Sequence, residues 1–319
     1  MLRKIYLRKI MVATMALVIL LILYFMPGAK VEDYAIEKVS TEYIKTNNTQ
    51  IIYLIDANGY VARTEILSTA KDEESKISTI LNGLIIGGKL KYVIPNGFRA
   101  VIPAETKVLD FLVKDKILTI NFSKEILNVK KEEEEKMIEA LIFSLTEIPS
   151  VNKIQILVNG NSLEELPNSK KKLKEPLDRS FGINKTYDLT STQNINEYTV
   201  YYVGKENETT YYVPVTKYVN AKELDKIKVV IDELSTSPIY EANLMSYLSS
   251  NVSLIDYSLE NECLKLNFND DIYTDDKKHL LEEVIYTISL SMKDNFSVNE
   301  VDFLVNNKEI YKNFLKSLE

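Results

Sequence analysis

One long segment of this chain occurs twice, about 147 residues apart. Val108–Ile126 reads VLDFLVKDKILTINFSKEI, and Leu254–Ile272 reads LIDYSLENECLKLNFNDDI. Two shorter pairs match at a similar spacing: Ser150–Gly160 with Ser297–Asn307, and Ile51–Ile55 with Thr199–Val203. Solenoid repeats typically measure only about 20–50 residues, so a copy of this length is a whole domain. The sequence therefore predicts two tandem copies of one small fold.

Each copy is predicted to begin with a β-hairpin followed by a helix. In the first copy the apolar runs Ile51–Ile55 and Tyr60–Leu67 flank Asn58-Gly59, which tolerates the positive φ angles of a tight turn. The helix is predicted from a stripe with a period of 3.6 residues. That stripe consists of Ile77, Ile80, Leu81 and Leu84.

The rest of each copy reads as two strands, a helix and a closing strand. In the first copy Leu109, Phe111 and Val113 alternate on one predicted strand, and the next strand carries Leu118, Ile120 and Phe122. A second stripe consists of Ile138, Leu141, Ile142 and Leu145, and Lys153–Val158 closes the unit. Two helices on a small sheet predict an α+β fold, a two-layer α/β sandwich with the order β-hairpin, α, β, β, α, β.

The N-terminus predicts a membrane anchor. Ile10–Ala29 carries no charge over 20 residues and follows a basic segment, and about 20 residues of helix span a bilayer. The basic flank predicts a cytoplasmic N-terminus with both domains extracytoplasmic. A cleaved signal peptide is the competing interpretation, but Pro27 fits the small-residue cleavage pattern poorly. No cysteine follows the apolar run closely, so lipid attachment to one is not expected.

The predicted organisation has six parts. They are a cytoplasmic basic segment at 1–9, a transmembrane helix at 10–29, a tether at 30–49, a first domain at 50–165, a linker at 166–197 and a second domain at 198–319. The linker mixes polar residues with Pro and lacks apolar periodicity, although Leu177, Phe181 and Ile183 indicate that part of it packs against a domain.

The inventory of reactive residues predicts no catalytic, cofactor or metal site. The formal charge of −7 argues against a general nucleic-acid binder, and no glycine-rich phosphate-binding motif occurs. His279 is the one histidine and lies at the start of a predicted helix, where a solvated residue is the simplest interpretation. Cys263 occupies the position of Ile117 in the first copy, which favours a buried small hydrophobic residue over a reactive thiol.

The charged and aromatic clusters also have structural interpretations. Glu132–Glu135 begins a predicted helix, where carboxylates favour the positive end of the dipole. Asn269–Asp271 lacks the alternating ligand positions of a calcium loop. The basic cluster of Lys170, Lys171, Lys172 and Lys174 is interpreted as solvated linker. The tyrosines at positions 201, 202, 211 and 212 fall in predicted strands, which favours packing over a sugar-stacking surface.

Several motifs resemble the GerMN, or "sporulation and spore germination", domain. They are AVIPAETKVLDF (Ala100–Phe111), LTINFSKEI (Leu118–Ile126), IFSLTEIPSVNKIQILVNG (Ile142–Gly160), EPLDRSFGIN (Glu175–Asn184) and TYYVPVTKYV (Thr210–Val219). Together they extend over both copies. The αββαβ order is similar to the ring-building motif of secretion-system rings.

This resemblance implies a non-enzymatic envelope scaffold without cofactors, acting in spore formation or germination. Its expected partners are envelope proteins of the channel or ring complex that joins mother cell and forespore. The domains would then occupy the space between the two membranes, and oligomerisation is compatible with this role. The alternative is an extracytoplasmic binding or sensor module for cell-wall glycan or peptide, which a cleft lined with convergent Tyr, Asn and Asp side chains would support.

Overall fold

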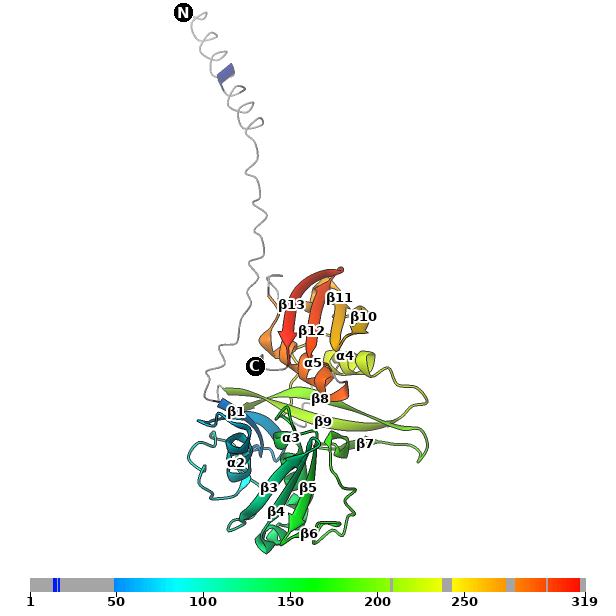
Figure 1. Ribbon diagram of the computed structural model, residues 1–319. Helices are drawn as coiled ribbons and strands as arrows, with labels where there is room; N and C mark the ends of the chain where they lie inside the picture. Colours follow the sequence, from blue (N-terminus) through cyan, green and yellow to red (C-terminus); the bar gives the residue numbers. More distant parts are fainter. Residues whose placement is uncertain are drawn as a thin grey trace, which may run out of the picture. The chain divides into compact units, whose positions relative to one another are not determined.

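The computed structural model describes residues 49–206, 209–236, 243–273, 279–296 and 298–315, together with Thr14, Met15 and Leu17 (Figure 1). The chain divides into two units, Met1–Asn47 and Asn48–Glu319, and both copies of the repeat lie in the second. The predicted tether and nearly all of the predicted anchor at 10–29 lie outside the described residues. Among the residues that are described, no helix combines the length and the apolar character needed to cross a bilayer.

The first copy has the predicted order of elements, with a short strand, β6 (Asn161–Ser162), added after the predicted closing strand. The elements are β1 (Thr49–Ile55), β2 (Val61–Leu67), α2 (Glu73–Leu84), β3 (Val108–Lys114), β4 (Ile117–Phe122), η1 (Lys124–Asn128), η2 (Lys131–Glu133), α3 (Glu134–Leu145), β5 (Lys153–Val158) and β6. Asp72 begins α2 by accepting a hydrogen bond from the backbone N–H of Ser75, and Glu73 and Glu74 lie in its first turn. All four residues of the predicted stripe on α2 are buried.

The second copy repeats this order after a connecting segment. The connection contains η3 (Arg179–Phe181) and β7 (Thr186–Asp188); the copy contains β8 (Ile195–Glu206), β9 (Thr209–Asn220), α4 (Lys226–Thr236), β10 (Leu254–Glu260), β11 (Cys263–Phe268), η5 (Asp270–Ile272), α5 (Glu282–Asn295), β12 (Glu300–Val305) and β13 (Lys308–Phe314). The predicted mixed α+β class is confirmed.

The hairpins of the two copies join into one sheet. Each copy has its own four-stranded sheet, β3-β4-β5-β6 or β10-β11-β12-β13, in which the central pair is parallel. A further five-stranded sheet has the order β1-β2-β9-β7, with β8 paired to β9 (Figure 1). The copies meet where Arg63 of β2 pairs with Tyr212 of β9, antiparallel. The repeated sequence did not predict this shared sheet.

Nearly all sides of helix α3 are covered by protein. It contacts β1 and β2 of the shared sheet and β5 of the other sheet. Every residue from Met137 to Leu145 is buried, whereas a helix on one face of a two-layer sandwich buries a single stripe. The predicted two-layer description is therefore incomplete, because the hairpin adds a further layer over the helix.

A β-bulge interrupts the predicted alternation of side chains along β3. The register shifts between Val108 and Asp110, so that Leu109 is left without a partner and is 49% exposed. The same shift occurs between Leu254 and Asp256 in β10, where Ile255 is 54% exposed. An extra residue in one strand reverses the inward and outward alternation on either side of it. The prediction that Leu109 shares a face with Phe111 was therefore wrong.

Among the described residues two hydrophobic cores form, one in each copy. The first gathers the hairpin β1–β2 with α2, α3 and the sheet β3–β5, and the second gathers the equivalent elements. Ala62 of the first hairpin belongs to the second core, which reflects the shared sheet. Leu177 and Ile183 of the predicted linker are buried in the first core, and Phe181 packs against it, as predicted.

Candidate functional site

The reactive residues singled out in the sequence do not converge on one place. His279 is exposed and precedes α5, which begins at Glu282, so it is not part of that helix. The tyrosines lie in β8 and β9 as predicted, and Tyr201, Tyr202 and Tyr211 are buried. These side chains serve the packing of the shared sheet.

Cys263 lies in a cluster with two carboxylates. The potential ligand atoms of Cys263, Glu300 and Asp302 lie within 4.8 Å of one another. The Lys312 ammonium is 2.9 Å from Asp302 and 3.2 Å from Glu300, so a lysine already supplies positive charge there. Burial, followed by the charge of Asp302, raises the pKa of Cys263 to about 11. The thiol is half-buried rather than fully buried and stays protonated at neutral pH, which makes it a poor nucleophile.

The acidic runs have structural partners. Glu134 and Glu135 lie in the first turn of α3, as predicted, whereas Glu132 and Glu133 of the same run lie in the preceding η2. The Glu134 carboxylate accepts hydrogen bonds from the backbone N–H groups of Asn168 and Ser169, which fixes the start of the connecting segment. In the second cluster Asp270 accepts a hydrogen bond from Asn306 at 3.1 Å.

A buried polar cluster lies where the two copies meet. The phenol oxygens of Tyr53 in β1 and Tyr201 in β8 are 2.9 Å apart. Tyr53 donates to Glu147 at 3.1 Å, and Tyr201 donates to Asp294 at 2.7 Å. Tyr53 and Tyr201 occupy equivalent positions of the repeat, so each copy contributes a tyrosine and a carboxylate to the same place.

Arg179 of the connecting segment links the two carboxylates. Its guanidinium pairs with Glu147 at 2.7 Å and with Asp294, and it also donates to the Thr146 hydroxyl. Lys293 pairs with Glu147 at 2.8 Å. The planar fork of arginine suits two carboxylates at once. A residue outside both repeated segments thus ties the copies together.

Neighbouring charges outweigh burial in setting the pKa values of this cluster. Burial alone would raise the pKa of Glu147, but Lys293, Arg179 and Arg63 together hold it well below its usual value. Burial alone would lower the pKa of Arg179, but Asp294 and Glu147 raise it well above its usual value. The side chain of Asp294 is only 3% exposed, so the cluster is screened little by solvent.

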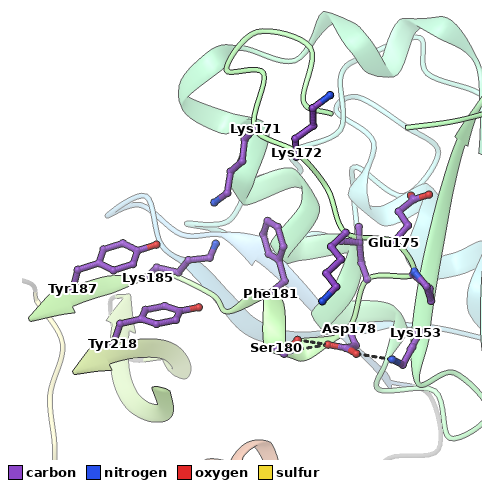
Figure 2. Close-up of a pocket in the computed structure, with 13 residues that line it drawn as sticks. Lys153, Lys171, Lys172, Glu175, Asp178, Ser180, Phe181, Lys185, Tyr187 and Tyr218 are labelled. Carbon is purple, nitrogen blue, oxygen red and sulfur yellow. Dashed lines mark hydrogen bonds and ion pairs between the residues drawn. The ribbon is translucent and has the colours of Figure 1, made fainter. Parts of the chain in front are cut away.

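A pocket of about 560 Å³ lies beside the connecting segment. Figure 2 shows Tyr187, Lys185 and Tyr218 on one side of it, Phe181 in the middle, and Glu175 with Lys153 on the other side. Lys171, Lys172 and Lys174 of the predicted basic cluster line this pocket. The interpretation of these lysines as solvated linker was incomplete, because sequence spacing did not reveal the concavity behind them.

Most lysines of the pocket are held by carboxylates. Lys153 pairs with Asp178 at 3.0 Å, and Lys172 pairs with Glu165 at 2.8 Å. Two further lysines reach the same helix, α3. Lys171 pairs with Glu135, and Lys185 pairs with Glu135 and Glu139. Lys174 is exposed and forms no ion pair within the described part of the chain.

The two aromatic side chains of the pocket wall come from neighbouring strands. β7 pairs parallel with β9, which places Tyr187 directly opposite Tyr218. Their rings are stacked, with centroids 5.0 Å apart and planes inclined by 16°. Tyr187 is 61% exposed, so its ring is available to solvent beside the lysines. No pattern in the sequence indicated this pair, because β7 is only three residues long.

The two repeats match one family model along most of their length. The model described as "Germane: Sporulation and spore germination" matches residues 51–164 and 199–311. The chain therefore belongs to this family, and the predicted resemblance to GerMN domains is confirmed.

The chain is also similar to a particular protein of this family. It is 36% identical over 265 residues to the spore germination protein GerM of Bacillus subtilis (strain 168), covering 81% of this chain and 71% of GerM. The solved structure of the tandem GerMN domains of the sporulation protein GerM from Bacillus subtilis matches with a TM-score of 0.75 and 33% identity. That match covers 82% of this chain and 91% of the solved chain.

Proposed function

We propose that this chain is a non-enzymatic, membrane-anchored scaffold that acts in spore formation or germination by contacting other envelope proteins. The homology to GerM over most of the chain supports a role in sporulation or germination, and it is the observation that carries the proposal. The family description points the same way for both repeats.

The joined repeats support a scaffolding mechanism. A scaffold must hold its contact surfaces in a fixed relation, and here the shared sheet and the Arg179 cluster connect the two copies. β3 and β10 lie at the ends of their sheets and carry exposed apolar side chains, such as Leu112 at 66% and Ile255 at 54%. Exposed edge strands with apolar side chains are surfaces on which partner proteins dock.

The anchor and the partners belong to the same proposal. A helix at 10–29 would hold the repeats at the outer face of the cell membrane, between mother cell and forespore in a sporulating cell. The proposed partners are components of a transenvelope channel or ring complex. Membrane fractionation tests the anchor: the wild-type chain is expected in the membrane pellet, and a chain lacking residues 10–29 is expected in the soluble fraction.

A clean deletion strain tests the proposed role. Loss of the gene is expected to lower the yield of heat-resistant spores or the rate at which they germinate, and the wild-type gene restores both. Leu112→Asp places a charge on the exposed edge strand without touching either core, and it is expected to complement less well than the wild-type gene at equal protein levels. Normal spore yield and germination in the deletion strain would contradict the proposal.

A further inference from the structure

We propose that the pocket beside the connecting segment binds an acidic saccharide, that is, a sugar that carries a carboxylate. This inference goes beyond the proposed role as a scaffold and does not depend on it. The pocket's volume of about 560 Å³ is within the range of small-ligand sites, which is roughly 300–1,000 Å³. It is lined by Tyr187 and Tyr218, by lysines, and by the polar groups of Glu175, Asp178 and Ser180 (Figure 2).

The tyrosine pair provides a platform for a sugar ring. A ring that served only the core would be covered, yet Tyr187 is 61% exposed while it stacks on Tyr218. Tyrosine combines a flat apolar body with a hydroxyl group, and a sugar combines an apolar face with hydroxyl groups at its rim. The platform therefore matches a saccharide better than it matches a purely aliphatic ligand.

The lysines provide the sites for a carboxylate. Among the residues that line the pocket, five are lysines and two are carboxylates, Glu175 and Asp178. Lys174 is exposed and has no ion-pair partner in the described part of the chain, so an incoming carboxylate displaces no existing pair there. Glu175 is itself occupied, because it accepts hydrogen bonds from the backbone N–H of Ile156 and from the Ser162 hydroxyl. An ammonium on a flexible stem suits a mobile carboxylate.

The walls of the pocket argue against an extended peptide as the ligand. A peptide that binds as an added strand needs free backbone groups on a strand edge. Leu177 exchanges two backbone hydrogen bonds with Ile154, at 2.8 and 2.7 Å, and Leu173 donates to Glu164 at 2.8 Å. β7 pairs with β9 on one side, and its outer edge is only three residues long, which is too short to hold an added strand. Recognition therefore falls to side chains, which is the mode that suits sugars.

Isothermal titration calorimetry on the full chain in detergent tests the proposal. The probe is the disaccharide of N-acetylglucosamine and N-acetylmuramic acid, which carries one carboxylate, and the matched neutral probe is the disaccharide of N-acetylglucosamine. Inorganic phosphate and a short polyglutamate peptide complete the series. The acidic disaccharide is expected to bind more tightly than the other three, and its affinity is expected to fall as salt is added.

Two substitutions test the contributions of the tyrosine platform and of the lysine charge separately. Tyr187→Ala is expected to weaken binding of the acidic disaccharide by about tenfold, because the stacking surface is lost. Lys174→Gln is expected to weaken it by roughly three- to fivefold, which is typical of one exposed ion pair. Tyr92→Ala and Lys89→Gln are the controls, since both residues are exposed and lie outside the pocket, and they are expected to leave the affinity unchanged.

The outcomes are distinct. Equal binding of the neutral and acidic disaccharides, or binding that Tyr187→Ala and Lys174→Gln leave unchanged, overturns the proposal. Preference for phosphate or for the polyglutamate peptide overturns it too, because the platform would then play no part. The spore phenotype of the deletion strain is measured separately, so this inference and the proposed scaffold role can fail independently.

Discussion

Two serines at equivalent positions of the repeat protect the free edges of the two hairpins. Ser144 in α3 accepts a hydrogen bond from the backbone N–H of Tyr53, and Ser291 in α5 accepts one from Tyr201, both at 2.8 Å. Asn295 adds a second pair of contacts to Thr199 on β8. A strand edge that would otherwise leave buried N–H groups unpaired is thereby satisfied by side chains of the covering helix.

Replacing Ser291 tests this role. Ser291→Ala leaves the Tyr201 N–H buried without a partner and is expected to lower the free energy of unfolding by about 1–3 kcal/mol in urea denaturation. Ser289→Ala is the matched control on the same helix. The Ser289 hydroxyl is buried and has no hydrogen-bond partner in the described structure, so its removal is expected to be neutral or slightly stabilising. Equal losses in the two variants would contradict the assignment.

The buried carboxylate of Glu147 predicts how stability depends on pH. Its folded pKa is held well below the ordinary value of 4.5 because Lys293, Arg179 and Arg63 outweigh the effect of burial. A depressed folded pKa contributes stability above the unfolded pKa, and this contribution is lost as the pH falls through about 4.5 toward the folded pKa. Urea midpoints measured from pH 7 to pH 3 are expected to fall in this window. Glu147→Gln is expected to make the fall shallower.

Arg179 is predicted to contribute more to the free energy of unfolding than any exposed lysine. Arg179→Ala leaves Glu147 and Asp294 without their shared guanidinium, at side-chain exposures of 8% and 3%, and is expected to cost about 3–5 kcal/mol. Lys172→Ala removes an ion pair whose lysine is 77% exposed and is expected to cost far less, because solvent screens that pair. Unfolding free energies from urea denaturation compare the two, and similar losses would show that the junction cluster has no special weight.

At the scale of elements, the repeated Asp and Asn residues hold a strand in register. Asn121 donates to Asp110 beside the bulge of β3 and accepts from the backbone N–H of Gly160. In the second copy Asn267 donates to Asp256 at 3.2 Å and accepts from the backbone N–H of Asn307 at 3.0 Å. Their recurrence thus reflects a bulge and a turn that both copies need, and it is explained without a catalytic role.

The turn between β3 and β4 predicts a stabilising substitution. Asp115 and Lys116 have φ angles of 51° and 61°, in the left-handed region that strains a residue with a Cβ. Lys116→Gly is expected to raise the free energy of unfolding by roughly 0.5–1 kcal/mol, since the relieved strain exceeds the added flexibility of the unfolded chain. Gly160→Ala is the converse test. Its φ is 82° and open space surrounds it, so conformation alone is expected to make it destabilising.

At the scale of the whole molecule, the duplication has produced two copies that pack against each other rather than two independent domains. Residues 48–319 form one compact unit, the hairpins pair antiparallel through Arg63 and Tyr212, and one arginine bridges both copies. Antiparallel contact between equivalent strands is how identical subunits meet in a two-fold dimer. The connecting segment contributes to this junction instead of merely spanning it.

The junction predicts that both repeats unfold together. Scanning calorimetry of the full chain is expected to show one transition for the repeats, with equal calorimetric and van't Hoff enthalpies. The double variant Tyr53→Phe with Arg179→Ala weakens the junction while leaving most of each core in place, and it is expected to broaden or divide that transition. Two separate transitions in the wild-type chain would mean that the copies are energetically independent.

Much of each copy was predictable because the relevant forces act between near neighbours in the sequence. The stripe of Ile77, Ile80, Leu81 and Leu84 gives α2 its buried face, and alternating residues give β4 its buried face. The repeat itself indicated the duplication and the family. The bulge at Leu109 escaped prediction because the apolar pattern does not record which residue of a strand lacks a partner.

Only the tertiary structure decided how the two copies meet and where a pocket forms. The Tyr53 and Tyr201 hydroxyls are brought to 2.9 Å by the packing of both cores, and Arg179 reaches Glu147 and Asp294 only in the folded chain. The platform of Tyr187 and Tyr218 depends on the pairing of a three-residue strand. Local periodicity determines the elements, whereas contacts between distant residues depend on the free energy of the whole packed molecule.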